Sequence, residues 1–305
     1  MTNKHPVLEN RIREVLAKYV DDWPLPGIKD TDARECLIAQ LIDSFRRVNY
    51  YLTIDSRSIS ENRLNPASAS FDPLRAAILH KRRGNINEAF WLAFLTTHFG
   101  RNLHTGWRLL TDVYRGLGDR VKWDWQTITG HVGEFREWLD EAETELKSNG
   151  KFGNHRKYEN CNGSKVRGTG AAIASYVSWI GQDHDHVQMI NHAKDAAGDD
   201  PHELFEFLYR NMNVTTFGRM GKFDYLTAIG KLGLVDIEPG NTYLNESTGP
   251  LRGMRVLFGN YDSGTLDLLL EELEARLSFP FGMQILEDAI CNWQKSPSIY
   301  RYFKG

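Results

Sequence analysis

The sequence predicts a mainly α-helical protein, organised as two helical lobes with a central cleft. Apolar residues recur at helical spacing over most of the chain, and strand-like alternation is confined to two short stretches, 235–238 and 255–258. No linker-like segment separates the two halves. At 305 residues the chain can form one large domain or two intimately packed lobes. We therefore expect a single compact unit over 1–305, with lobes at about 30–150 and 151–305.

In the first half, the helices follow from the spacing of apolar residues and from helix-breaking residues between them. Pro24, Pro26 and Gly27 end the first helix, and Thr31 opens the second. The Ser-, Asn- and Pro-rich stretch 54–73 is expected to be a loop that leads into a helix after Pro73. Helices are expected at 7–20, from 31 to about 48, and at 74–80, 87–99, 107–117 and 132–146.

The second half begins with a polar, glycine-rich and basic stretch, 147–170. Between 147 and 167 six Lys or Arg residues face a single acid, Glu159. Clustering of this kind can create a positive face on a molecule whose net charge is −3. Helices are then expected at 171–180, 202–212, 223–232, 264–277 and 281–294.

Composition excludes several classes of protein. Lys plus Arg number 37 and Asp plus Glu number 40, which excludes a uniformly basic nucleic-acid coat. Cys36, Cys161 and Cys291 form no CxxC motif, which fits a reducing cytoplasm. No apolar run reaches the roughly 18 residues that span a bilayer. We therefore expect a cytoplasmic protein with no membrane partner.

Common cofactor and metal motifs are weak or absent in the sequence. His184 and His186 flank Asp185, and His-x-His can bind zinc, but no cysteine ligand lies nearby. The chain has neither a P-loop signature nor a Gly-x-Ser-x-Gly elbow. We expect no metal and no cofactor.

The segment 215–244 is the richest in candidate functional residues. A glycine turn from Gly218 to Gly221, flanked by Arg219 and Lys222, precedes a helix and can present backbone N–H groups to a DNA phosphate. It resembles the helix-hairpin-helix of DNA base-excision glycosylases. That resemblance implies an Asp at the sugar C1′ further along the chain, and Asn241 occupies the corresponding place, 241 − 221 = 20 residues after the turn. Here the hairpin is Gly-x-x-Gly and an Asn replaces the acid, so another carboxylate must supply the negative charge.

Longer strings extend this resemblance over most of the chain, from about 40 to 305. KFGNHRKYE (151–159), FGRMGKFDYL (217–226) and MQILEDAICNWQKSP (283–297) resemble the alpha-glutamyl/putrescinyl thymine pyrophosphorylase family, clade 3. The resemblance implies a fold related to helix-hairpin-helix DNA glycosylases, with a DNA-binding cleft. It also implies that the partner is double-stranded DNA carrying hypermodified bases. We expect the protein to act as a monomer.

Chemistry on a stacked base requires extrusion of the nucleotide, and this requirement groups the candidate residues. An acid must lie near the reacting carbon, phosphate contacts must hold the strand, and a pocket must receive the base. The catalytic candidates are Asp224, Asp288 and Glu287, with Asn241 positioning water or sugar. The DNA-binding candidates are Arg156, Lys157, Lys165, Arg167, Gly218, Arg219, Gly221 and Lys222. The base-pocket candidates are Asn154, His155, Tyr158, Glu159 and Tyr243.

The favoured function is a DNA N-glycosylase that excises a bulky hypermodified pyrimidine, such as glucosylated hydroxymethylcytosine, from phage DNA in anti-phage defence. A carboxylate would stabilise the oxocarbenium-like sugar and align water. The enzyme is expected to be monofunctional, because the lysine of bifunctional glycosylases has no clear counterpart in this sequence and Lys222 is the only near candidate. The alternative is a transferase or pyrophosphorylase that acts on 5-substituted thymine without glycosidic cleavage. A non-catalytic module that binds modified DNA is a third possibility.

Overall fold

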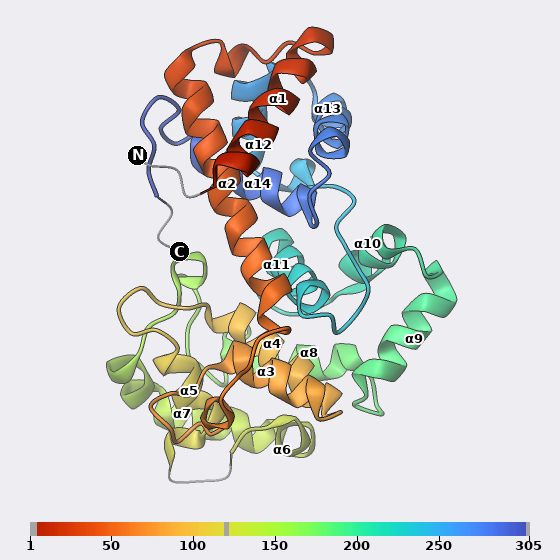
Figure 1. Cartoon of the computed structure of the whole chain (residues 1–305). Helices are drawn as coiled ribbons and strands as arrows, with labels where there is room; N and C mark the ends of the chain where they lie inside the picture. Colours follow the sequence, from red (N-terminus) through yellow and green to blue (C-terminus); the bar gives the residue numbers. More distant parts are fainter. Residues whose placement is uncertain (1–4, 119–121, 303–305) are drawn as a thin grey trace. The chain divides into compact units, whose positions relative to one another are not determined.

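The computed structural model describes residues 5–118 and 122–302, which form helices joined by loops (Figure 1). Within these residues there are fourteen α-helices and five short 3₁₀ turns. The described residues contain no strand, and their only β pairing is an isolated bridge between Asn102 and Gly106. The prediction of a mainly α fold is confirmed.

Contacts divide the described residues into two units. Unit 1 holds residues 5–53 and 238–302, and unit 2 holds residues 54–118 and 122–237. These bounds differ from the lobes expected at 30–150 and 151–305. The 215–244 segment singled out in the sequence therefore has its first part in unit 2 and its last part in unit 1.

Unit 1 is formed by both ends of the chain. Its α-helices are α1 (Pro6–Asp22), α2 (Thr31–Ile54, ending at the unit boundary), α12 (Gly249–Phe258), α13 (Ser263–Leu277) and α14 (Gly282–Trp293). Their apolar faces share one core. Two buried hydrogen bonds join sequence-distant helices in it: Tyr19 Oη donates to Leu269 O at 2.7 Å, and Trp293 Nε1 donates to Ala33 O at 2.9 Å. These donors are satisfied without water, as buried polar groups require.

Unit 2 holds the other helices in an unbroken stretch of chain. They are α3 (Pro73–Arg82), α4 (Ile86–Phe99), α5 (Arg108–Tyr114), α6 (Trp125–Gly130), α7 (Val132–Asn149), α8 (Thr169–Ile180), α9 (His186–Ala197), α10 (Pro201–Asn211) and α11 (Arg219–Lys231). Over residues 5–118 and 122–302, every helix is too short or too polar to cross a bilayer.

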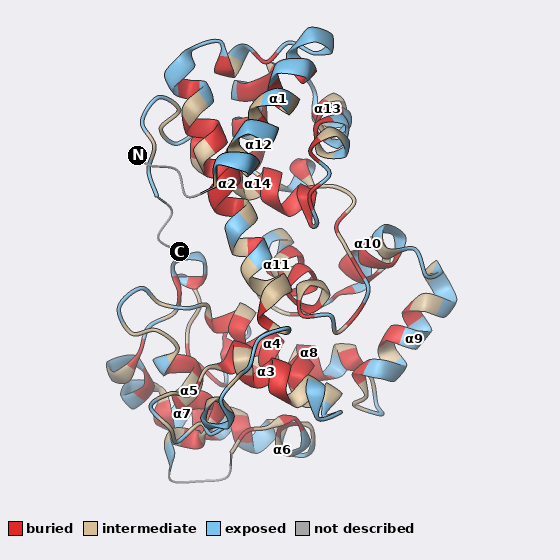
Figure 2. Cartoon of the chain, viewed as in Figure 1, coloured by how far each residue is buried: buried red, intermediate tan, exposed pale blue. Residues whose placement is uncertain are grey.

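Helix α4 forms the centre of unit 2 and is buried on nearly all sides, as Figure 2 shows in red. The Phe94 ring stacks on Tyr176 of α8 with centroids 3.8 Å apart, and it also stacks on Phe217 at 5.2 Å. Aromatic pairs of this kind add about 0.5–1.5 kcal/mol beyond their buried area. The packing fixes α8 and the start of α11 against α4, and it thereby fixes the loops next to them.

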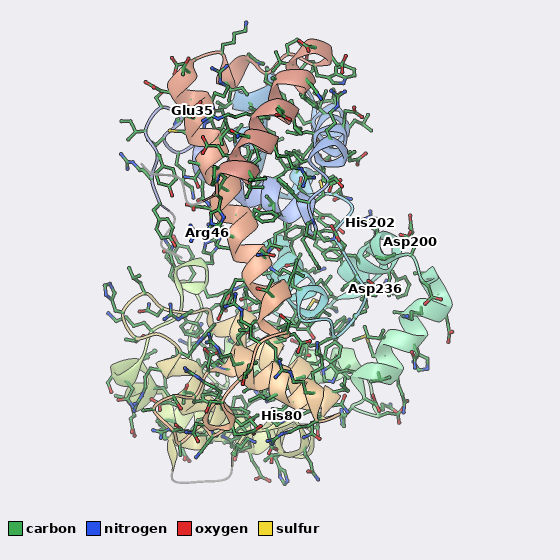
Figure 3. All side chains as sticks on the ribbon, in the orientation of Figure 1. Glu35, Arg46, His80, Asp200, His202 and Asp236 are labelled. Carbon is green, nitrogen blue, oxygen red and sulfur yellow. The ribbon has the colours of Figure 1, made fainter. Side chains whose placement is uncertain are left out.

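Aspartates define where several helices begin. Asp72 Oδ1 accepts the backbone N–H of Arg75 at 3.0 Å, and the helix after Pro73 was predicted from this Phe-Asp-Pro turn. Asp200 accepts the N–H groups of His202 and Glu203 at the start of α10; Asp200 and His202 are labelled in Figure 3. Each such cap stabilises a helix by about 1 kcal/mol.

Three local expectations from the sequence were wrong. Residues 255–258 belong to α12 and form no strand, because Met254, Leu257 and Phe258 are buried at helical spacing while Val256 is exposed. Residues 235–238 are irregular. Helices α6 and α9 were not expected at all; their first turns are capped by Asp124 and Asp185 respectively.

Candidate functional site

Arg156 and Asp224 form the central ion pair of the candidate site in unit 2. Arg156 ends the 3₁₀ turn η4 (Asn154–Arg156), and its side chain is only 6% exposed. Its Nη2 lies 3.3 Å from Asp224 Oδ2, and its guanidinium carbon lies 5.1 Å from the centre of the Phe217 ring. The guanidinium is therefore held inside unit 2, where it joins the basic segment to α11.

The glycine turn expected at 218–221 is instead the beginning of a helix. Helix α11 begins at Arg219 with Gly218 as its N-cap, so Gly221 is the third helical residue. A Cβ on Gly221 would lie 2.8 Å from Phe217 Cγ and 3.2 Å from Arg156 Nη1. Gly221 therefore permits a close approach of Phe217 and Arg156 to the helix. Asp224 lies in the second turn of α11.

Lys222 and Arg219 lie against aromatic rings. The Lys222 ammonium donates to Tyr209 O at 3.2 Å and lies 5.4 Å from the centre of the Tyr209 ring. The Arg219 guanidinium lies 5.9 Å from the Phe223 ring centre. Both side chains are half-buried at the start of α11.

The rest of the basic segment is exposed on an anchored loop. Lys157, Lys165 and Arg167 are exposed, as are His155 and Tyr158. The loop is tied to α8, because the backbone N–H groups of Thr169 and Gly170 donate to the carbonyl oxygens of Asn160 and Asn162 at 3.0 Å each. These bonds hold the exposed cations on a defined backbone.

A cavity of about 650 Å³ opens beside this loop, entirely within unit 2. Its volume falls in the range of about 300–1,000 Å³ that is typical of ligand sites. Three of the candidates from the sequence line it: Asn154, Lys157 and Glu159. The other lining residues are Asn102, Leu103, His104, Leu109, Lys147, Gly150, Lys151, Phe152, Asn160 and Cys161.

Glu159 is the carboxyl group of this cavity, and it is half-buried. Burial raises its pKa above the usual range, while the Thr216 hydroxyl and the positive charges of Arg156 and Arg167 oppose the rise. A carboxyl group that holds its proton more tightly can donate a hydrogen bond to a ligand. Exposed Tyr158 is not among the lining residues, although it lies between Lys157 and Glu159 in the chain.

The remaining candidates lie in unit 1. Asn241 Oδ1 accepts the backbone N–H of Tyr243 at 2.9 Å, and Tyr243 has a left-handed backbone with φ of 52°. Asp288 Oδ2 lies 3.7 Å from Arg47 Nη2, so this acid forms an ion pair with another residue of the same chain. Glu287 is buried in α14.

Asp267 of α13 was not among the candidates, although it lies near the 241–243 segment in unit 1. Burial, followed by the negative charge of Glu271, raises the pKa of Asp267 to about 6, and the Thr242 hydroxyl lowers it. In the sequence this residue reads as one of several acids on a solvated helix. Its proximity to Thr242 is a long-range contact that no local pattern encodes.

The His184–His186 string serves the core of unit 2. His186 Nε2 lies 2.8 Å from Tyr176 Oη, and His186 Nδ1 lies 2.8 Å from Asn87 Oδ1. Burial lowers the pKa of His186 to about 3, so the ring is neutral at physiological pH. Both ring nitrogens already have partners within the protein.

The geometry thus brings together one group of the expected residues and leaves others apart. Asn154, Lys157 and Glu159 share a cavity, and Arg156 pairs with Asp224. The sequence did not single out the wall of that cavity formed by Leu103, His104 and Phe152, because these residues come from segments about fifty positions apart.

The model of one protein family matches residues 32–305: alpha-glutamyl/putrescinyl thymine pyrophosphorylase, clade 3. The chain belongs to this family. The match includes unit 2, the part of unit 1 from residue 32 onward, and every candidate residue described above. No curated protein and no solved structure matches the chain. The name of the thymine pyrophosphorylase family implies an enzyme that acts on modified thymine.

Proposed function

We propose that this thymine pyrophosphorylase-family protein is a DNA N-glycosylase. It flips a bulky hypermodified pyrimidine, such as glucosylated hydroxymethylcytosine, out of phage DNA and excises it, leaving an abasic site. Such an activity would serve anti-phage defence. The observation that carries the proposal is the 650 Å³ cavity beside the basic loop, with Glu159 in its wall. Membership of a family named for modified thymine supports a modified base as the target.

Two physical features of unit 2 suit an extruded nucleotide. Lys157, Lys165 and Arg167 are exposed on the anchored loop, where they can contact phosphates without reading sequence. The adjoining cavity is larger than an unmodified base needs, and a modified base would fill more of it and make more of its polar contacts. Extrusion costs a few kcal/mol, and contacts of these two kinds repay that cost.

The chemistry needs a carboxyl group near the departing base or the sugar. In our proposal, Glu159 donates a hydrogen bond or a proton to the leaving pyrimidine. Asp224, which pairs with Arg156, is the second candidate acid in unit 2, and its carboxylate would stabilise the positive charge that develops on the sugar. Asn241, Glu287 and Asp288 belong to unit 1, and the proposed step in unit 2 does not depend on them.

The proposed enzyme is monofunctional. Lys222, the one lysine the sequence offers as a lyase, has its ammonium group on Tyr209 O. We therefore expect no Schiff base with the abasic sugar. Trapping of a protein–DNA adduct by borohydride in the native protein, lost in Lys222→Ala, would show that this part of the proposal is wrong.

The second candidate function is a base-modifying transferase or pyrophosphorylase that acts on 5-substituted thymine and leaves the glycosidic bond intact. The family name favours it. It would use the same basic loop and cavity, with the reaction at the 5-methylene carbon in place of C1′. In that case the absence of an acid at Asn241 is understandable, because no sugar cation has to be stabilised.

One experiment separates these functions. Duplexes with glucosylated hydroxymethylcytosine, 5-hydroxymethyluracil (a 5-substituted thymine) or plain cytosine at a single position are incubated with the protein, treated with alkali, and analysed for strand cleavage and nucleoside mass. Cleavage only of a modified duplex supports the glycosylase. A changed nucleoside mass without cleavage supports the transferase, and retention of unchanged DNA supports a binding module.

Variants test whether the activity belongs to the cavity. Glu159→Gln removes the acidic proton while keeping the shape of the side chain, and we expect excision to fall at least a hundredfold. Glu145→Gln makes the same change at an exposed position of α7 outside the cavity and is expected to behave as the native protein. Equal activity of the two variants would remove Glu159 from the mechanism.

A further inference from the structure

The cavity wall carries an excess of positive charge. Lys147, Lys151 and Lys157 line it, against the single carboxyl group of Glu159. Lys147 Nζ lies 2.6 Å from Glu143 Oε1, so its charge is partly balanced from outside the wall. Among the described residues, Lys151 and Lys157 form no ion pair with an acid. Lys157 Nζ lies 5.1 Å from the Tyr158 ring centre. The charges of Lys151 and Lys157 are therefore available to interact with a ligand in the cavity.

Glu159 does not cancel this charge. It is half-buried, and burial favours its neutral form by raising its pKa. When Glu159 is protonated, the wall offers three cations and no anion. The charge balance of the wall is thus positive in either protonation state.

The amide groups of the wall shape it without changing its charge. Asn102 Nδ2 donates to Phe152 O at 2.9 Å, and Asn160 Nδ2 donates to Arg167 O at 3.0 Å. These two side chains hold the backbone of the wall in place. Hydrogen bonds from uncharged side chains to a ligand can therefore come from Asn154 and from a protonated Glu159. Contacts from charged side chains come from the lysines.

We propose that this cavity selects modified pyrimidines by the charge of the 5-substituent, accepting neutral or anionic groups and rejecting cationic groups, the putrescinyl group of the family name included. The inference rests on the proposed function, in which the cavity receives the extruded base. An ammonium group placed among the exposed Lys147, Lys151 and Lys157 would meet like charges. A carboxylate would gain at least one ion pair there, and a hydroxyl group would hydrogen-bond without electrostatic penalty.

The test uses three duplexes that differ only at one base: 5-carboxymethyl-, 5-hydroxymethyl- or 5-aminomethyl-deoxyuridine. These substituents are similar in size and are anionic, neutral and cationic respectively. Contacts to the phosphates are the same in all three, so differences in Kd report the substituent. We expect the carboxymethyl and hydroxymethyl duplexes to bind at least tenfold more tightly than the aminomethyl duplex, measured by fluorescence anisotropy at low salt.

A charge-reversed cavity provides the second measurement. Lys151→Glu with Lys157→Glu is expected to reverse the order, so that the aminomethyl duplex binds most tightly. Lys18→Glu with Lys194→Glu makes the same change in net charge at positions outside the cavity. This control is expected to weaken all three complexes alike and to keep the native order. Overall weakening from lost phosphate attraction is thereby separated from selection by the substituent.

The outcomes for selectivity and for excision are distinguishable. Equal affinity for the three duplexes, or an order that survives the reversal of Lys151 and Lys157, overturns the inference. Mass analysis of the same mixtures reports base loss independently. If the order holds and a duplex with glucosylated hydroxymethylcytosine loses no base under the same conditions, the inferred selectivity is supported and the proposed glycosylase is overturned. Base loss without selectivity gives the opposite conclusion.

Discussion

Arg156 and Asp224 lie 68 positions apart in the sequence, and their side chains form an ion pair with Nη2 and Oδ2 3.3 Å apart. The arginine side chain is 6% exposed and the aspartate side chain 39% exposed. The pair therefore consists of a buried cation and a partly solvated anion. Loss of the anion would leave the buried guanidinium without this partner, which is more costly than losing an exposed pair.

Replacement of Asp224 should consequently destabilise unit 2. We expect Asp224→Ala to lower the free energy of unfolding by about 1–3 kcal/mol, measured by urea denaturation followed by circular dichroism. Glu206→Ala disrupts the exposed pair of Glu206 with Arg210 on α10 and should change stability by about 0.5 kcal/mol or less. A similar small effect for both variants would show that the Arg156–Asp224 pair contributes little.

Gly221 allows the start of α11 to pack closely against Phe217 and Arg156. In Gly221→Ala the new Cβ would lie 2.8 Å from Phe217 Cγ. The clash should outweigh the gain in helix propensity of about 1 kcal/mol, with a net loss of about 1–3 kcal/mol in unfolding free energy.

Gly133 provides the matched control for that substitution. It lies in the first turn of α7, and a Cβ there would have no atom within 4 Å. Gly133→Ala should therefore leave stability unchanged or raise it by up to about 1 kcal/mol. Stabilisation by both alanines would mean that Phe217 can move aside without cost.

Much of the fold could be predicted because helical periodicity is a local signal. Ile12, Leu16 and Tyr19, for example, are spaced to bury one face of α1, and the structure buries them. Helix α12 was missed because Arg-Val-Leu-Phe at 255–258 resembles a strand when read alone. Only the burial of Met254 with Leu257 and Phe258 shows the helical spacing.

The candidate site was less predictable, because its parts come together only on folding. Residues 154–159 could be singled out as a group since they are consecutive. Leu103 and Lys147 join them in the cavity wall through the packing of α4, α5 and α7, and no sequence pattern encodes that packing. The same reason explains why Asp267 beside Thr242 was not foreseen.

Asp267 should make the stability of unit 1 depend on pH. Its pKa is raised to about 6 in the folded protein, so the folded state binds a proton more tightly than the unfolded chain does. This contribution to stability is fully present below the unfolded pKa of about 3.9 and is lost as pH rises through about 6. At neutral pH the ionised carboxylate is therefore a net cost to folding.

Asp267→Asn removes that cost while keeping the shape of the side chain. We expect the variant to be more stable than the native protein by about 1 kcal/mol at pH 7.5, a figure reduced for the partial exposure of the group. The difference should shrink towards zero at about pH 4, where the native carboxyl group is protonated. Thermal unfolding across this range measures it. An advantage for Asn that is constant with pH would show that ionisation is not its cause.

Tyr158 is 88% exposed, next in sequence to the cavity residues Lys157 and Glu159. Leu103, which lines the cavity, is 61% exposed, and Val166 of the same basic loop is 85% exposed. Exposed apolar groups beside a basic loop suit contact with bases, because rings stack on any base. We expect Tyr158 to occupy the space that an extruded nucleotide leaves in the duplex.

Tyr158→Ala should therefore impair excision from duplex DNA at least tenfold and leave excision from single-stranded DNA nearly unchanged, because a single strand has no stack to refill. Tyr158→Phe should retain duplex activity, since the ring is kept. The fluorescence of 2-aminopurine placed beside the target base reports extrusion even where no base is lost. Because Tyr158 is exposed, all variants should unfold at the native temperature. Equal losses on duplex and single strand would assign Tyr158 to general DNA binding.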